Sequence, residues 1–166
     1  MKKTIFECIV IVVAVVLIRS FIATPIIVNG SSMYPTLEDG EYMLLNKISY
    51  RFNEIKRGEI IVFEYDNERL IKRVIGLPGE KIAVIDGNLY INDQVYEEDY
   101  LEENTVDFTL EELGLDSTIP KGYYFVMGDN RDESKDSRLI GYITEDSIIG
   151  KTSFSLYPFS KFGNVE

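Results

Sequence analysis

The chain of 166 residues contains no histidine and a single cysteine, Cys8. Without histidine, the usual serine–histidine catalytic pair and the common histidine-ligated zinc sites are excluded. One cysteine excludes a disulfide within the chain and any cysteine-rich metal site. A catalytic serine in this chain would therefore need a base other than histidine.

Positive charge is also scarce. The chain has 17 Lys and Arg residues against 28 Asp and Glu residues, a net charge of −11. Nucleic-acid-binding proteins present a basic surface to the phosphate backbone, so this balance argues against a nucleic-acid partner. An acidic, solvated surface accounts for the charge, and the length suits one domain with its own core.

The N-terminal segment is the longest apolar stretch. After lysines at positions 2 and 3, the run Thr4–Val28 carries only two charges, Glu7 and Arg19. This length predicts a transmembrane anchor over residues 1–24, with a cleaved signal peptide or a buried core helix as alternatives. The two lysines favour a cytoplasmic N-terminus, which would place residues 25–166 outside the cytoplasm.

After the apolar stretch, short runs rich in Ile, Val, Tyr and Phe alternate with glycine-containing turns. This pattern predicts a mainly β domain built from an antiparallel, barrel-like sheet. The segment Ile82–Asn92 predicts a hairpin with its tight turn at Asp86-Gly87 or Gly87-Asn88.

One short helix is predicted at Val106–Leu115. Asp107 is its expected N-cap, and Gly114 lies near its expected C-terminal end.

Two adjacent serines, Ser31 and Ser32, stand in the sequence GSSM. Gly30 permits a sharp turn before them, and Pro35 stiffens the segment that follows. A strained turn of this kind can expose a hydroxyl and aim backbone N–H groups at an oxyanion. An ordinary serine-rich surface turn is the alternative.

Lysine can replace histidine as the base where burial lowers its pKa from the usual value of about 10.4. In the segment RLIKRVIGL, Lys72 shares a strand face with the aliphatic residues Leu70 and Val74. Arg73, on the opposite face, cannot act as a base because its guanidinium stays charged. The alternative for Lys72 is an exposed strand residue whose stem covers apolar surface.

Three segments, in this order, resemble the type I signal peptidases (peptidase family S26), the bacterial Ser/Lys leader peptidases, in their Gram-positive form. GSSMYPTL at Gly30–Leu37 resembles the nucleophile motif, which maps the nucleophile to Ser32. IKRVIGLPGE at Ile71–Glu80 resembles the general-base motif, which maps the base to Lys72. GDNRDESKDSR at Gly128–Arg138 resembles the third box of the family.

The resemblance implies a membrane-anchored serine endopeptidase that removes N-terminal signal peptides from exported preproteins after a small-x-small motif such as Ala-x-Ala. It implies no metal and no organic cofactor. It implies preproteins, the lipid bilayer and the nearby export translocon as partners. It also implies a single-pass protein of the plasma membrane with its catalytic domain outside the cytoplasm.

Within the third box, the resemblance implies that Ser134 hydrogen-bonds the base lysine. Asp136 and Arg138 would form a supporting ion pair, and Asp129 would shape the fold around the site. Read without the family, this stretch is a charged surface turn, and its interleaved arginines argue against a metal site.

The chain departs from the family pattern in two places. Gram-negative members have a serine two positions before the nucleophile that helps form the oxyanion hole, and Gly30 stands there in this chain. Ser31, a main-chain N–H or water remain as possible substitutes. The segment of about residues 81–121 is short, so the non-catalytic β insert of the family is expected to be small.

Two other functions are compatible with parts of the sequence. A self-cleaving repressor shares the Ser/Lys chemistry, but the apolar N-terminus and the acidic balance count against it. A membrane-tethered β domain that binds without catalysis is the second alternative.

Overall fold

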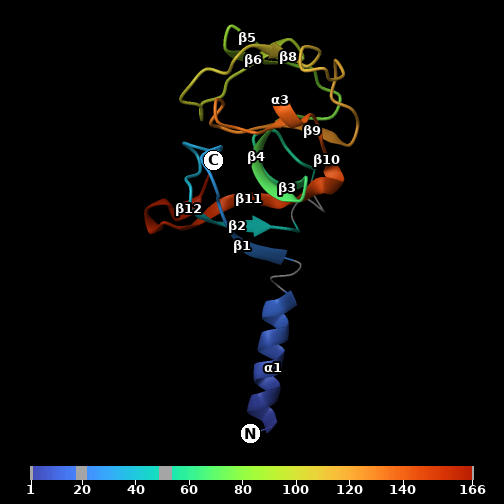
Figure 1. The fold of residues 1–166 in the computed structure, drawn as a ribbon. Helices are drawn as coiled ribbons and strands as arrows, with labels where there is room; N and C mark the ends of the chain where they lie inside the picture. Colours follow the sequence, from blue (N-terminus) through green and yellow to red (C-terminus); the bar gives the residue numbers. More distant parts are fainter. Residues whose placement is uncertain (1, 18–21, 49–53, 166) are drawn as a thin grey trace.

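The computed structural model describes residues 2–17, 22–48 and 54–165. A single N-terminal helix extends away from a body made of two antiparallel sheets (Figure 1). The helices are α1 (Lys2–Leu17) and α3 (Ser137–Ile140), with 3-10 turns η2 (Glu145–Ser147) and η3 (Phe159–Lys161). The strands are β1 (Ala23–Ile27), β2 (Tyr42–Asn46), β3 (Ile60–Tyr65), β4 (Glu68–Gly76), β5 (Ile82–Ile85), β6 (Asn88–Ile91), β7 (Gln94–Tyr96), β8 (Phe108–Thr109), β9 (Tyr123–Met127), β10 (Ile143–Thr144), β11 (Ile148–Tyr157) and β12 (Gly163–Asn164).

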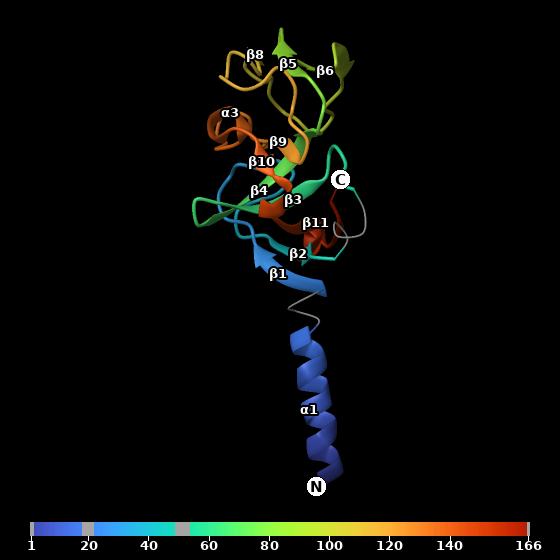
Figure 2. The ribbon, with the colours of Figure 1, turned by 90° about the vertical axis from the view of Figure 1, so that its right-hand side faces the viewer.

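Helix α1 leaves exposed those of its apolar side chains that the structure describes. Figures 1 and 2, which view the molecule from directions 90° apart, both show it projecting from the body. Within residues 2–17, 22–48 and 54–165, no helix combines the length and hydropathy needed to span a membrane, and α1 itself has 16 residues. Part of the anchor predicted over residues 1–24, namely residues 1 and 18–21, lies outside the described residues.

The larger sheet has eight strands in the order β1-β2-β11-β3-β4-β9-β10, with β12 paired to β11. All of its strand pairs are antiparallel, so the predicted antiparallel, mainly β architecture is confirmed. The order ends at β1 and β10, so the described strands form a sheet with two edges.

The smaller sheet has four strands in the order β7-β6-β5-β8. The hairpin predicted at Ile82–Asn92 is confirmed as β5 and β6, with Ile85 opposite Asn88. Asp86 and Gly87 form its turn with φ values of 50° and 75°, the left-handed backbone that a two-residue turn requires.

The helix predicted at Val106–Leu115 is wrong. Phe108–Thr109 forms strand β8, which pairs with β5, and a single turn ending at Gly114 follows. The carboxylate of Asp107 accepts hydrogen bonds from the backbone N–H groups of the hairpin turn. Strand pairing and the burial of Phe108 therefore override the local capping pattern.

Three apolar clusters form the core. The first joins the smaller sheet to β4 and β9, and the second lies against β3, β4 and β9. The third comprises Val28, Met33, Leu37, Met43 and Ile60, and it lies beneath the loop between β1 and β2. This third cluster fixes the loop that carries Ser32.

Candidate active site

Ser32 lies in the loop between β1 and β2, and main-chain hydrogen bonds close the base of this loop. Val28 donates to the carbonyl of Glu41 (2.8 Å), and Gly40 donates to the carbonyl of Val28 (2.9 Å). The side chains of Met33 and Leu37, one and five residues after Ser32, are fully buried. This anchoring holds the half-buried Ser32 in a defined position above the third core cluster.

Gly30 adopts φ 88°, a conformation that L-residues rarely take, and its N–H donates to Asp39 Oδ1 (2.7 Å). A glycine is therefore favoured two positions before Ser32 for backbone reasons.

Lys72 lies on β4 and is only 3% exposed. Its Nζ donates hydrogen bonds to Ser32 Oγ (2.7 Å) and to the backbone carbonyl of Ile71 (2.8 Å). The structure therefore brings together the two residues that the sequence singled out as nucleophile and base.

The environment of Lys72 disfavours its charged form. Burial lowers the pKa of Lys72 from 10.5 to about 8, and the negative charges of Asp136 and Asp129 oppose this shift. Desolvation is the larger effect because it removes water from the ammonium group, while both carboxylates are already paired with arginines. A lysine with this pKa is partly neutral near pH 8.

Asp136 and Arg138 form the predicted ion pair. Arg138 Nη2 lies 2.8 Å from Asp136 Oδ2, and the Asp136 side chain is fully buried. Asp136 also accepts a hydrogen bond from the backbone N–H of Gly128 (3.0 Å), while Arg138 donates to the carbonyl of Arg131 (2.6 Å). The pair therefore ties the start of α3 to the segment that follows β9.

Asp129 forms a second buried ion pair, with Arg73. Arg73 donates two hydrogen bonds to the Asp129 carboxylate, from Nε (2.9 Å) and from Nη2 (2.7 Å). It also donates to the carbonyl of Gly58 (2.9 Å). Because Arg73 directly follows Lys72, this pair joins the strand that bears the lysine to the third box.

Ser134 is buried next to the site, but the predicted hydrogen bond to Lys72 is absent. Its Oγ makes no hydrogen bond within the described part of the chain. The Lys72 ammonium instead uses Ser32 and the carbonyl of Ile71 as acceptors. A Cβ built on Gly128 would lie 2.3 Å from both Ser134 Oγ and the carbonyl oxygen of Ser32, so these groups all meet closely at Gly128.

Ser31 points to a different partner from Ser32. It is exposed, and its hydroxyl donates to Glu133 Oε2 (2.9 Å). The backbone N–H of Ser32, by contrast, donates no hydrogen bond to a described residue. This N–H is available to an oxyanion formed at Ser32, and the Ser31 hydroxyl is engaged with the third-box loop.

The sequence reading missed three residues that organise the site: Arg73, Gly128 and Arg131. The sequence pattern places Arg73 on the strand face opposite Lys72 and gives it no role at the site. In the structure, both faces of β4 are buried from Lys72 to Gly76. Arg131 is buried and not part of a surface turn. Of the third-box charges, only Asp132, Glu133 and Lys135 have the exposure expected of such a turn. The signal available in the sequence was the glycine at the head of the third box, which marks a close approach.

A groove of about 420 Å³ includes both Ser32 and Lys72 in its lining. It lies between β1 and the first half of β4, and most of its lining is aliphatic: Pro25, Ile26, Ile27, Val28, Val62, Leu70 and Ile71. Along Glu68–Lys72, β4 pairs with β3 on one side and with no other described strand, because its pairing with β9 begins at Arg73. The groove therefore borders a free strand edge next to a hydroxyl and a buried amine.

The sequence of the chain is similar to those of known signal peptidases. The family model described as "Signal peptidase, peptidase S26" matches residues 1–157. The signal peptidase IB of Staphylococcus aureus (strain COL) is 42% identical over 180 residues, covering 98% of this chain and 94% of that protein. The signal peptidase I T of Bacillus subtilis (strain 168) is 42% identical over 163 residues, covering 92% of this chain and 83% of its own length.

Among solved structures, the crystal structure of a signal peptidase I from Enterococcus faecalis V583 superimposes with a TM-score of 0.57 at 42% sequence identity. The match covers 60% of this chain and 97% of that one. The family match over most of the sequence and the high identity to several signal peptidases agree. The chain therefore belongs to the signal peptidase family, peptidase S26, as a serine peptidase of the signal peptidase I class.

Proposed function

We propose that Ser32 is the nucleophile and Lys72 the general base with which this serine peptidase removes signal peptides. The observation that carries the proposal is the distance of 2.7 Å between Lys72 Nζ and Ser32 Oγ. The pKa of Lys72, lowered to about 8 by burial, supports it, because a partly neutral amine can accept the hydroxyl proton.

The first half of the reaction forms an acyl-enzyme. Neutral Lys72 takes the proton from Ser32 Oγ as this oxygen attacks the scissile carbonyl, and a tetrahedral oxyanion forms. The resulting Lys72 ammonium gives the proton to the leaving nitrogen, and the bond to the mature protein breaks. Lys72 is neutral again, and the signal peptide is held as an ester on Ser32.

The second half hydrolyses the ester. Neutral Lys72 accepts a proton from a water molecule, whose oxygen attacks the ester carbonyl. Lys72 then returns the proton to Ser32 Oγ as the signal peptide leaves with a free carboxylate. One group thus acts as base and acid in turn in both halves.

The oxyanion is stabilised by the backbone N–H of Ser32, which has no hydrogen-bond acceptor among the described residues. Ser31 supports the loop through its contact with Glu133. Asp129, Asp136 and Arg138 position the third box against Ser32, and Ser134 lines the buried side of the site.

The cleavage segment of the preprotein binds in the groove between β1 and β4. Its backbone adds to the free edge of β4 at Glu68–Lys72, so that main-chain hydrogen bonds hold it whatever its sequence. The aliphatic lining then selects side chains by size, which favours small residues at alternate positions, as in Ala-x-Ala.

Residues 1–24 anchor the enzyme in the plasma membrane as a single pass, with the N-terminus cytoplasmic and residues 25–166 outside. The exposure of every described apolar side chain of α1 supports this, because such a surface is costly in water. Anchoring places the enzyme in the same bilayer as its preproteins and close to the export translocon, which raises the effective concentration of the cleavage segment.

The test is cleavage of a purified preprotein by the full chain in detergent, with the product mass reporting the cut position. Ser32→Ala is expected to abolish cleavage without loss of thermal stability. Ser160→Ala, at an exposed serine in η3, is the matched control and is expected to keep full activity. Retained cleavage in Ser32→Ala would reject this nucleophile.

A further inference from the structure

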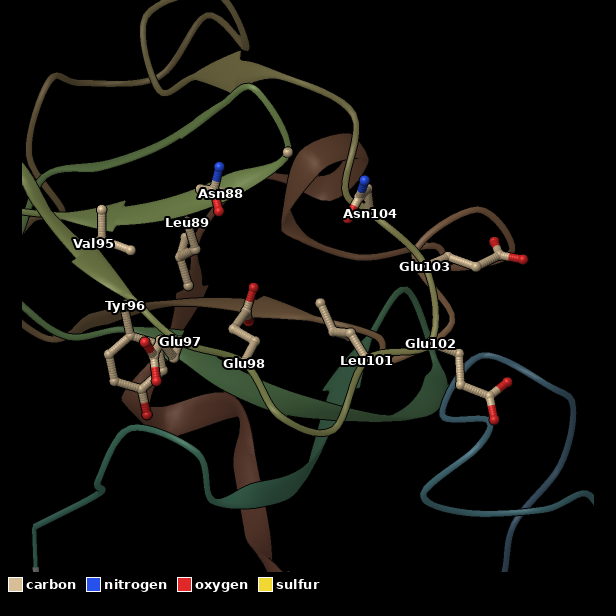
Figure 3. Close-up of a pocket in the computed structure, with 11 residues that line it drawn as sticks. Asn88, Leu89, Val95, Tyr96, Glu97, Glu98, Leu101, Glu102, Glu103 and Asn104 are labelled. Carbon is tan, nitrogen blue, oxygen red and sulfur yellow. The ribbon is translucent and has the colours of Figure 1, made fainter.

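The segment between β7 and β8, two strands of the smaller sheet, contacts β4 of the larger sheet and the third box. Figure 3 shows part of it, from Glu97 to Asn104, along the wall of a cavity of about 250 Å³. Glu102 and Glu103 point away from the strands of the smaller sheet there. Two residues of the segment contact buried arginines: Glu98 pairs with Arg131 of the third box, and Tyr100 lies against Arg73 of β4.

Tyr100 covers the arginine that follows the base lysine. The guanidinium carbon of Arg73 lies 3.9 Å from the centre of the Tyr100 ring, within the range of a cation–π contact. Arg73 is bound on its edge to the Asp129 carboxylate. The ring therefore closes one face of an ion pair that is itself almost completely buried.

Glu98 holds the Tyr100 ring in place. The Tyr100 hydroxyl donates to Glu98 Oε1, and burial together with the negative charge of Glu98 raises the pKa of Tyr100, so this hydroxyl keeps its proton. Glu98 also pairs with Arg131 through both carboxylate oxygens (2.6 and 3.1 Å). Arg131 in turn donates to the carbonyl of Gly128 (3.0 Å), beside Ser32.

We propose that Tyr100 is a positioning residue for the catalytic pair, acting through the Arg73–Asp129 ion pair, with Glu98 orienting its ring. The smaller sheet thereby contributes to catalysis through one segment that touches both the lysine strand and the third box. This inference rests on the proposed function, because it concerns the base that Lys72 supplies.

The charged groups around Lys72 explain how Tyr100 would act on it. Asp129 and Asp136 face Lys72 from the third box, and Arg73 and Arg138 neutralise them. Without the Tyr100 ring, water reaches the Arg73–Asp129 pair and weakens it. Both the added water and the less compensated Asp129 charge stabilise the ammonium form of Lys72.

The experiment compares the pH dependence of kcat/KM for preprotein cleavage by the full chain in detergent, from about pH 6 to pH 10. Tyr100→Ala is expected to move the midpoint of the rising limb upward by about 0.5 to 1 pH unit, from the size of a partly desolvated cation–π contact. Tyr100→Phe keeps the ring and is expected to keep the parent midpoint.

Tyr96→Ala is the matched control. Tyr96 belongs to the same region and its ring also lies over an arginine, Arg57, at 5.2 Å, but Arg57 pairs with Glu80 rather than with the third box. This variant is expected to keep the parent midpoint. A purely structural role for Tyr100 would lower stability or rate without moving the midpoint.

An unchanged midpoint in Tyr100→Ala overturns the inference, whatever happens to the rate. Where Tyr100→Ala does not fold, as judged by thermal unfolding, Tyr100→Leu is read in the same way, because leucine keeps apolar bulk without the ring. Failure of the inference about Tyr100 can be distinguished from failure of the proposed function by the activity of Lys72→Arg. Full activity in Lys72→Arg would remove the base assignment itself, while an inactive Lys72→Arg with an unchanged Tyr100→Ala midpoint overturns only the role of Tyr100.

Discussion

Lys72 Nζ lies 2.7 Å from Ser32 Oγ although the two residues are 40 positions apart in the sequence. In the larger sheet, the strand β1 that precedes Ser32 is separated from β4 by β2, β11 and β3. The sheet must therefore curve for the β1–β2 loop to reach the middle of β4. Curvature of the sheet, not adjacency of strands, therefore brings Lys72 to Ser32.

The rate of cleavage should depend on the protonation of Lys72. Only the neutral amine accepts a proton, so kcat/KM is expected to rise with pH and to level off above a midpoint near 8, the value to which burial lowers the Lys72 pKa. Below the midpoint the rate should fall about tenfold per pH unit. A rising limb that begins only near pH 10 would show that Lys72 is solvated or is not the base.

Lys72→Arg is expected to lower kcat by about 10²–10⁴, because arginine keeps the positive charge and cannot accept a proton. Lys121→Arg, at an exposed lysine before β9, is the control for an equivalent change and should leave cleavage unaltered. The measurement is initial-rate cleavage at saturating preprotein. Substantial activity in Lys72→Arg would require another base.

Lys72 should also destabilise the fold at neutral pH. Its pKa is about 8 when folded and 10.5 when unfolded, so the ammonium costs up to about 3 kcal/mol below pH 8. Lys72→Met is expected to raise the free energy of unfolding by as much as this at pH 7. Between pH 8 and 10.5 the unfolded parent binds more protons than the folded parent, so the stability of the parent increases as the pH rises. The difference in stability between Lys72→Met and the parent therefore shrinks over this range.

Urea unfolding of the parent and Lys72→Met at pH 7 and pH 10 measures this difference. Lys121→Met provides a matched exposed lysine. A stability difference for Lys72→Met that is the same at both pH values would contradict the lowered pKa.

Gly128→Ala is expected to displace Ser32, the proposed nucleophile. The added Cβ would meet the Ser32 carbonyl oxygen and Ser134 Oγ at 2.3 Å each, so the Ser32 loop must move. A displacement of this kind can reduce kcat by about 10²-fold, with a loss of about 1–3 kcal/mol in stability.

Gly122→Ala separates these effects. Gly122 adopts φ 80° with no atom within 4 Å of an added Cβ, so the substitution strains the backbone without crowding the site. It should lower stability while leaving kcat intact. Equal kcat losses in the two variants would mean that Gly128 has no special role at the site.

Asp129→Asn is expected to destabilise the protein by about 3–5 kcal/mol, because it leaves the buried Arg73 charge without its partner. The comparison is Asp93→Asn, which breaks an exposed pair with Lys81 and should cost less than about 1 kcal/mol. Thermal or urea unfolding of both variants gives the two values. Similar small losses would show that the Arg73–Asp129 pair is hydrated in solution.

Local sequence patterns identified the β architecture and the hairpin at Ile82–Asn92, because strand alternation and a left-handed two-residue turn are short-range properties. The same patterns failed at Val106–Leu115, where pairing with β5 outweighed a capping signal. They also treated β4 as a strand with two different faces. Packing covers both faces from Lys72 to Gly76, so Arg73 is as buried as Lys72.

The sequence by itself determined which chemistry is available: the chain has no histidine, so a lysine is the candidate base. One lysine stands between aliphatic residues, and it follows a serine motif in an order that resembles a known family. The tertiary structure alone decided that Lys72 meets Ser32, that its ammonium loses water, and that Arg73 and Tyr100 join the same network. The reason is physical. Backbone preference depends on a few neighbouring residues, whereas desolvation of a charge depends on every group packed around it, and those groups come from distant strands and loops.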